Sequence, residues 1–412
     1  MVKFERFVLD NGLIVLVNED KNTPLVAMNI LYKVGARDEQ EDKTGFAHLF
    51  EHLMFGGSVN IPNYDKPLQE AGGENNAFTN NDITNYYMTI PAVNLETGFW
   101  LESDRMLNLA FSDKSLDVQR DVVIEEFKQR YLNQPYGDVW LMLRPLAYKV
   151  HPYKWPTIGQ TPDHISDAKM EDVRSFFTKY YNPTNAIMAL SGGITVDRAK
   201  ELCKKWFAEI PAGQALKRNI PIEPKQTEKR TKTVHRKVPV NMLYLTFHGD
   251  SRVDSSYYAM DLLSDVLGNG KSSRLHKSLV LDKKIFTDIS AYQTGNIDKG
   301  LFVISGKIAN GIDSIVAEKE VFNEIQKFVN DGPNENEIEK VRNKIESVHA
   351  FGELENANRA LNLCFNEMLG DAELTNQVVE KYNKVTAKDI QDKAKEILRE
   401  ENCSALHYLK EE

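Results

Sequence analysis

The sequence predicts an α+β protein built from two homologous domains, each a mostly antiparallel sheet packed with helices. Its 412 residues exceed what one hydrophobic core usually supports, because chains beyond about 250–300 residues tend to divide into domains. Strand-like and helix-like segments occur in separate runs rather than in regular alternation, which is typical of α+β folds. Similar segments also recur on either side of a charged, proline-containing stretch, which indicates a duplication.

The amino-terminal part reads as strands followed by helices. Residues 4–9 and 13–17 are rich in β-formers and flank Asp10-Asn11-Gly12, and Asn-Gly between such runs predicts a hairpin. Further strands are expected where apolar residues alternate with polar ones, over 25–34 and 84–90. Helical periodicity begins at Phe46 and returns over 95–110 and 115–132.

The domain boundaries follow from a stretch with many charges, several prolines and few large apolar residues, which is typical of a solvated connector. We expect a catalytic domain over 1–212, a linker over 213–237 and a homologous domain over 238–412. The similar segments before and after this linker are 28–32 with 240–244, 169–180 with 387–398, and 186–190 with 404–408.

Composition excludes several classes of protein. The net charge of -9 argues against a general nucleic-acid binder, and no stretch is long and apolar enough to span a membrane. Cys203, Cys364 and Cys403 form no C-x-x-C pair, so neither a disulfide framework nor a cysteine zinc site is expected. No signal peptide is recognisable, so the cytoplasm is the expected location, or the periplasm or an organelle if a leader has been removed.

The segment from Gly45 to Gly57 contains the candidate zinc ligands and catalytic residue. Its apolar residues follow the stripe of an amphipathic helix, at Phe46, Leu49, Phe50, Leu53 and Met54. His48 and His52 are one helical turn apart on a face away from that stripe. Two imidazoles so placed can bind one zinc ion, with Glu51 beside them to activate a zinc-bound water. Such a histidine pair also arises by chance, but the adjoining glutamate and the helical context favour a metal site.

A third ligand is required, because catalytic zinc sites hold three protein ligands and a water. The sequence offers Glu125 and Glu126 in a second helical segment. Neighbouring helical residues point about 100° apart, so only one of the two can face the zinc. Spacing alone does not choose between them, and most such pairs are simply solvated.

The order His48-x-x-Glu51-His52 is the inverted zinc motif of the inverzincins. The surrounding sequence resembles the pitrilysin/insulinase family, especially its short members similar to mitochondrial processing peptidase. The resemblance covers nearly the whole chain and includes residues 72–79 and the loop at His151-Pro152-Tyr153. It implies two homologous α+β domains and one zinc ion per chain.

The resemblance also implies roles for individual residues. The family's third ligand follows a stretch that matches Arg120 to Val123 here and leads to Glu126, with Glu125 as the reserve. The expected metal ligands are therefore His48, His52 and Glu126, and the expected catalytic base is Glu51. A family edge strand, to which an extended peptide adds its backbone, matches Asn76, Ala77, Phe78 and Thr79. Seen alone, this last segment reads equally well as a turn.

The chain departs from the family pattern at three positions. Gln119 stands where the family often has a second glutamate. Val280 and Thr287 stand where the family usually carries an arginine and a tyrosine that bind substrate and the tetrahedral intermediate. Because short members commonly work in pairs, the resemblance implies a heterodimer whose homologous partner chain supplies the arginine and tyrosine, with a homodimer as the alternative.

The expected function is that of a zinc-dependent endopeptidase acting on extended or unfolded peptides. The alternative is a non-catalytic peptide-binding or scaffold subunit of a peptidase complex. Such subunits typically lose the zinc residues, whereas this chain keeps all of them. A metal-storage role has no support, because no further histidine or cysteine cluster occurs in the sequence.

Overall fold

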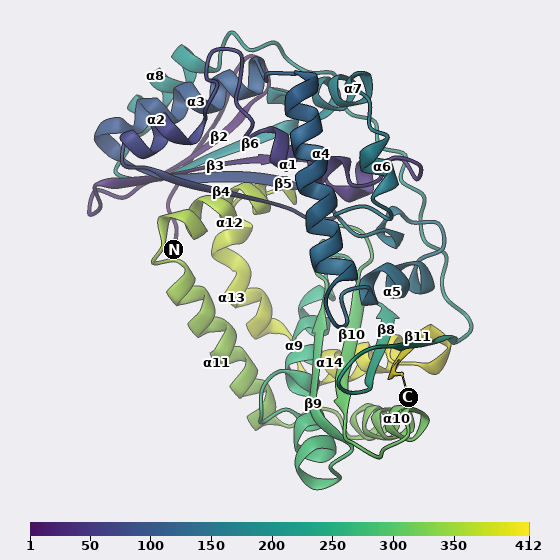
Figure 1. Ribbon diagram of the computed structural model, residues 1–412. Coiled ribbons are helices and arrows are strands. Elements are labelled where there is room, and N and C mark those ends of the chain that lie inside the picture. The colour runs from purple at the N-terminus through teal and green to yellow at the C-terminus, as the bar shows by residue number, and fades with distance from the viewer. Residues whose placement is uncertain (412) are drawn as a thin grey trace. The chain divides into compact units, whose positions relative to one another are not determined.

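The computed structural model describes residues 1–411 and divides into two compact units that interleave along the chain (Figure 1). The first unit comprises Met1–Gln129, Trp155–Ile220 and Ala350–Gln377. The second unit comprises Arg130–Lys154, Pro221–His349 and Val378–Glu412. Each unit contains one mixed sheet with helices packed on it, so the predicted fold class is confirmed.

The sheet of the first unit has six strands in the order β1-β2-β6-β3-β5-β4. Its strands are β1 (Glu5–Val8), β2 (Ile14–Glu19), β3 (Leu25–Tyr32), β4 (Glu74–Thr79), β5 (Thr84–Pro91) and β6 (Ala186–Gly192). Strands β1 and β2 form the hairpin expected around Asn11-Gly12. Every pairing is antiparallel except that of β2 with β6, so the sheet is mostly antiparallel, as the sequence predicts.

Helices cover both faces of this sheet. Those of the first unit are α1 (Phe46–Leu53), α2 (Asp65–Glu70), α3 (Leu95–Leu107), α4 (Asp113–Phe127), α6 (Asp163–Ser166), α7 (Met170–Tyr180), α8 (Val196–Trp206) and α12 (Asn356–Met368). Met28 and Met88 face Gly98 of α3. The neighbouring side chains of Ala27 and Leu31 point to the opposite face, because side chains alternate along a strand, and there they pack with Leu363 of α12.

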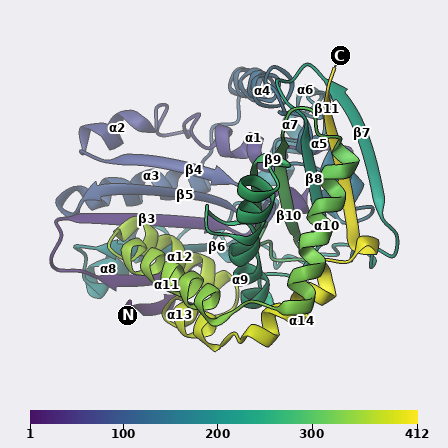
Figure 2. The same ribbon diagram turned by 90° about the horizontal axis from the view of Figure 1, so that it is seen from below.

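The second unit repeats this plan with five strands in the order β7-β11-β8-β10-β9 (Figure 2). They are β7 (Arg230–Arg236), β8 (Met242–His248), β9 (Phe286–Gln293), β10 (Leu301–Ile308) and β11 (Cys403–Lys410). Its helices are α5 (Val139–Ala147), α9 (Tyr257–Gly268), α10 (Ser314–Asp331) and α14 (Ala387–Ile397). Two further helices, α11 (Glu335–Gly352) and α13 (Leu374–Lys384), have residues in both units. Within residues 1–411, no helix combines the length and apolar character that crossing a membrane requires.

The two sheets correspond strand by strand, which supports the predicted duplication. The order β2-β6-β3-β5-β4 matches β7-β11-β8-β10-β9, and in both sheets only the first of these pairings is parallel. A side-chain contact repeats as well. The Asn185 amide donates to the carbonyls of Lys33 and Tyr180, at 3.2 and 2.8 Å. The Asn402 amide donates in the same way to the carbonyls of His248 and Ile397, at 2.9 and 2.8 Å.

The units differ from the boundaries drawn at 1–212, 213–237 and 238–412, because each takes a helix from the other half of the chain. Residues 350–377 bring α12 to the first sheet, and residues 130–154 bring α5 to the second, where Val139 and Leu143 pack against Leu406. The end of the expected linker is strand β7, which pairs in parallel with β11. Local composition could not show these pairings, because the partners lie far apart in the sequence.

Candidate metal centre

Helix α1 presents two histidines on one side. Its apolar stripe is buried as the sequence predicts, at Phe46, Leu49, Phe50, Leu53 and Met54. The stripe fixes the rotation of the helix, so that His48 and His52 stand on the opposite side, 12% and 24% exposed. Their ring centroids are 4.8 Å apart. Partial exposure leaves the two imidazoles accessible to an ion and a substrate.

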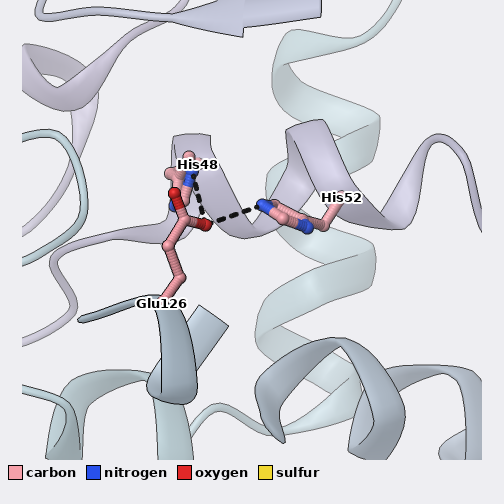
Figure 3. Close-up of side chains that lie close together, drawn as sticks. All are labelled: His48, His52 and Glu126. Carbon is pink, nitrogen blue, oxygen red and sulfur yellow. Dashed lines mark ion pairs between the residues drawn. The ribbon is translucent and has the colours of Figure 1, made fainter. Parts of the chain in front are cut away.

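Glu126, near the end of α4, brings its carboxylate to both imidazoles (Figure 3). Its Oε2 lies 3.6 Å from Nε2 of His48 and 3.3 Å from Nε2 of His52. Glu125 turns away, with a 60% exposed side chain whose Oε1 lies 2.6 Å from Nζ of Lys128. The packing of α4 against α1 therefore separates two carboxylates that spacing alone left equivalent.

These three side chains fit a zinc ion. Zinc binds histidine nitrogen and carboxylate oxygen at about 2.0–2.2 Å in tetrahedral geometry, so neighbouring ligand atoms stand about 3.3–3.6 Å apart. The two spacings between Glu126 and the imidazoles are close to this range, and one ligand atom from each residue lies within 4.8 Å of the others. Among residues 1–411, this is the one such group of histidine, cysteine and carboxylate side chains.

Glu51 lies on α1 between the two histidines and is half-buried. Its surroundings include the phenols of Tyr86 and Tyr181. Burial raises the pKa of Tyr86 and of Tyr181 well above the usual value, and the negative charge of Glu51 raises both further. Both phenols therefore stay protonated beside Glu51.

A buried polar cluster supports the carboxyl end of α1 and was not identified from the sequence. Arg105 of α3 is 2% exposed and donates twice to Glu102, at 2.8 and 2.7 Å. Its guanidinium lies over the rings of Tyr64 and Tyr86, at 4.5 and 4.4 Å from their centroids. Tyr86 in turn donates to the carbonyl of Phe50 in α1, at 3.2 Å. Glu102 and Arg105 are neighbours within α3, but no local pattern marks the cluster, because Tyr64 and Tyr86 lie outside that helix.

Glu39 is a second residue that the sequence reading missed. It is 8% exposed and accepts hydrogen bonds from two backbone amides at the start of α1, those of Gly45 and Ala47. Burial raises the pKa of Glu39 to about 8, against the lowering effect of these two hydrogen bonds. No sequence signal marks this role, since Glu39 lies 6 residues before Gly45, the position at which a capping side chain is normally recognised.

The residues expected to bind substrate form strand β4 at one edge of the first sheet. Asn76, Ala77, Phe78 and Thr79 are half-buried or exposed, and β4 pairs with β5 on one side. Among residues 1–411, no strand pairs with its other side. Helix α1 contacts β4, so this open edge lies next to the helix that carries the histidines.

Val280 and Thr287 lie in the second unit. Val280 belongs to a π-helical segment, His276–Asp282, and is partly buried against the core of that unit. Thr287 is exposed on β9 and donates to the carbonyl of Lys307, at 3.3 Å. Neither side chain carries a charge or a phenol.

Comparisons with known proteins identify the family of this chain. Residues 14–160 match the family described as insulinase (peptidase family M16), and residues 167–345 match the one described as the peptidase M16 inactive domain. A zinc protease, PqqE, of Helicobacter pylori is 32% identical over 349 residues, which cover 82% of this chain and 78% of that protein. The chain therefore belongs to the insulinase family of peptidases.

More distant relatives and solved structures agree. An uncharacterized zinc protease, YmxG, of Bacillus subtilis is 24% identical over 98% of this chain and 97% of its own length. A probable mitochondrial-processing peptidase subunit beta of Arabidopsis thaliana is 22% identical over 71% of this chain and 57% of its own length. The crystal structure of a protease from Helicobacter pylori superposes with a TM-score of 0.92 at 27% identity, over 99% of this chain and 100% of that one.

Proposed function

We propose that this chain is a zinc-dependent endopeptidase that hydrolyses extended or unfolded peptides. The observation that carries the proposal is the meeting of His48 and His52 from α1 with Glu126 from α4, next to Glu51. Relatives named zinc proteases support it, since one of them is 32% identical over most of the chain. Retention of all four residues favours catalysis over a purely structural role.

The roles follow from the positions of the side chains. His48, His52 and Glu126 would hold one zinc ion. A zinc ion there would lower the pKa of a water molecule and polarise the carbonyl of the peptide bond. Glu51 would take a proton from the attacking water and pass it to the leaving amine.

The open edge of β4 supports a peptide substrate in extended form. A chain segment laid along β4 can pair with its backbone, which binds many sequences through main-chain hydrogen bonds. Contact between α1 and β4 favours a scissile bond close to the histidines. A compact folded protein cannot supply such a strand without unfolding, so unfolded chains and short peptides are the proposed substrates.

We further propose that a homologous partner chain completes the site. Val280 and Thr287 cannot donate the charged or phenolic hydrogen bonds that the family resemblance leads one to expect there. Such donors stabilise the negative charge that develops on the carbonyl oxygen, and losing one typically costs about 3–4 kcal/mol of barrier stabilisation. A heterodimer, with the partner supplying an arginine and a tyrosine, is favoured over a homodimer, because a second copy of this chain would carry the same valine and threonine.

Metal analysis and peptide hydrolysis test the function together. Purified chain should contain about one zinc per molecule and, together with the homologous partner, cleave an unstructured peptide, with loss of both zinc and cleavage after chelation and recovery when zinc is restored. Peptide binding without cleavage, in zinc-loaded protein and with the partner present, would favour the non-catalytic alternative. Hydrolysis that is fast for the isolated chain and unchanged by the partner would contradict the proposed heterodimer.

A further inference from the structure

Helix α1 carries His48, Glu51 and His52, yet it is only 8 residues long. Isolated helices shorter than about 12–15 residues are marginal in water, so the position of α1 depends on its packing and its ends. The first turn of any helix also leaves backbone N–H groups without intrahelical partners. These groups are usually capped by a side chain at the residue before the helix.

The residue before α1 is Gly45, which cannot cap the helix. Gly45 has a left-handed backbone, with φ at 89°, and carries no side chain. A Cβ added there would lie 2.6 Å from the carbonyl oxygen of Ile158, which is closer than atoms can approach. Serine, threonine, aspartate and asparagine are therefore all excluded from the position where they would normally begin a helix.

Glu39 supplies the missing cap from outside the helix. Its Oε2 accepts the N–H of Gly45 at 2.9 Å, and its Oε1 accepts the N–H of Ala47 at 2.8 Å. A carboxyl group can accept both hydrogen bonds whether it is protonated or ionised, and ionisation strengthens them, because a negative charge at a helix amino terminus is favoured by the helix dipole. One carboxyl group thus ties the residue immediately before His48 to a separate segment of the chain.

Glu39 is itself held in place. It follows the short 3₁₀ helix Ala36–Asp38. The indole of Trp155 donates to the carbonyl of Ala36 at 2.9 Å, and the hydroxyl of Tyr180 donates to the carbonyl of Asp38 at 3.0 Å. Burial raises the pKa of Glu39 to about 8, so its position disfavours the charged form. A carboxylate that only closed a surface loop would lie in water, where ionisation has no such cost.

We propose that Glu39 is a positioning residue for the zinc site, holding α1 so that His48 and His52 meet Glu126. This inference rests on the proposed zinc-dependent function. It goes beyond that function by assigning zinc affinity in part to a side chain that touches neither the metal nor the substrate. Because Glu126 comes from another helix, a small displacement of α1 changes both distances to its carboxylate.

The test compares Glu39→Gln and Glu39→Ala with a matched control, Thr195→Ala. The hydroxyl of Thr195 accepts the N–H of Arg198 at 3.2 Å and so caps α8, a helix of the same unit that carries no part of the site. Zinc affinity is measured by competition with a chromophoric chelator, and thermal stability is measured on the zinc-free chains.

Glu39→Ala should bind zinc about 10–100-fold more weakly, the range found when residues that orient metal ligands are removed. Glu39→Gln should show a smaller loss, because its amide oxygen can still accept one of the two N–H groups. Thr195→Ala should lower the melting temperature of the zinc-free chain and leave zinc affinity unchanged.

Two results overturn the inference. If both Glu39 variants melt at lower temperature but keep wild-type zinc affinity, Glu39 has a structural role only. If Glu39→Ala does not fold, Glu39→Gln decides, and wild-type affinity in that variant has the same meaning. Failure of the wild-type chain to bind zinc is a different outcome, because it removes the proposed function together with this inference.

Discussion

Replacing Glu126 by glutamine removes the carboxylate charge between the two imidazoles while keeping the size of the side chain. The oxygen that lies 3.6 and 3.3 Å from the histidine nitrogens would become part of a neutral amide, which is a poor zinc ligand. The matched control is Glu125→Gln on the next residue of α4, whose carboxylate is 60% exposed and paired with Lys128. The two variants differ by one position and have the same chemistry.

The magnitude follows from the number of ligands. Zinc sites with four protein ligands contribute about 10–16 kcal/mol, so one ligand accounts for roughly 3–4 kcal/mol, which is a factor of about 10²–10³ in affinity. At a free zinc concentration about 1,000 times the wild-type Kd, bound zinc adds about 4 kcal/mol to the free energy of unfolding. A Kd raised about 100-fold would leave about 1.4 kcal/mol of that stabilisation.

Two measurements check this expectation. Chelator competition gives the zinc Kd directly, and denaturant unfolding with and without zinc gives the stabilisation that zinc provides. Glu126→Gln should lose most of both, and Glu125→Gln should keep both. Loss of zinc from Glu125→Gln with retention in Glu126→Gln would refute the assignment, because the ligand would then lie on the face of α4 that the structure turns away from α1.

Three further predictions concern the same unit. Glu51→Gln should keep its zinc and lose hydrolysis by about 10²–10⁴-fold, because the base is removed but no ligand is; near-normal turnover would exclude that role. A test peptide with proline at a position paired to β4 should escape local cleavage, because proline lacks the N–H donor, whereas an alanine peptide is cleaved. In the zinc-free folded protein, the pKa of Glu39 is raised to about 8 from 4.5. As pH rises, the unfolded chain therefore loses this proton before the folded chain does. The difference in unfolding free energy between wild type and Glu39→Gln should therefore decrease as pH rises from about 4.5 to about 8, by up to about 1.4 kcal/mol per pH unit, and stay constant at higher pH. A difference that does not depend on pH would count against a buried carboxyl group.

Much of this protein follows from local patterns. The apolar stripe of α1 fixes its rotation, and a helix places residues four apart on one side, so the shared face of His48 and His52 follows from sequence. The hairpin at Asn11-Gly12 and the duplication are of the same kind, since each depends on residues close together in the chain or on a repeated pattern.

Only the tertiary structure decided which residues of separate elements contact one another. Sequence spacing allows Glu125 or Glu126 to face α1, and only the packing of α4 brings the carboxylate of Glu126 to the imidazoles. The cap from Glu39 and the exchange of α5 and α12 between units likewise join residues whose contact no local pattern encodes. The physical reason is common to all three: periodicity sets the direction of a side chain about its own helix or strand, whereas the partner it meets depends on burying the apolar faces of several elements at once.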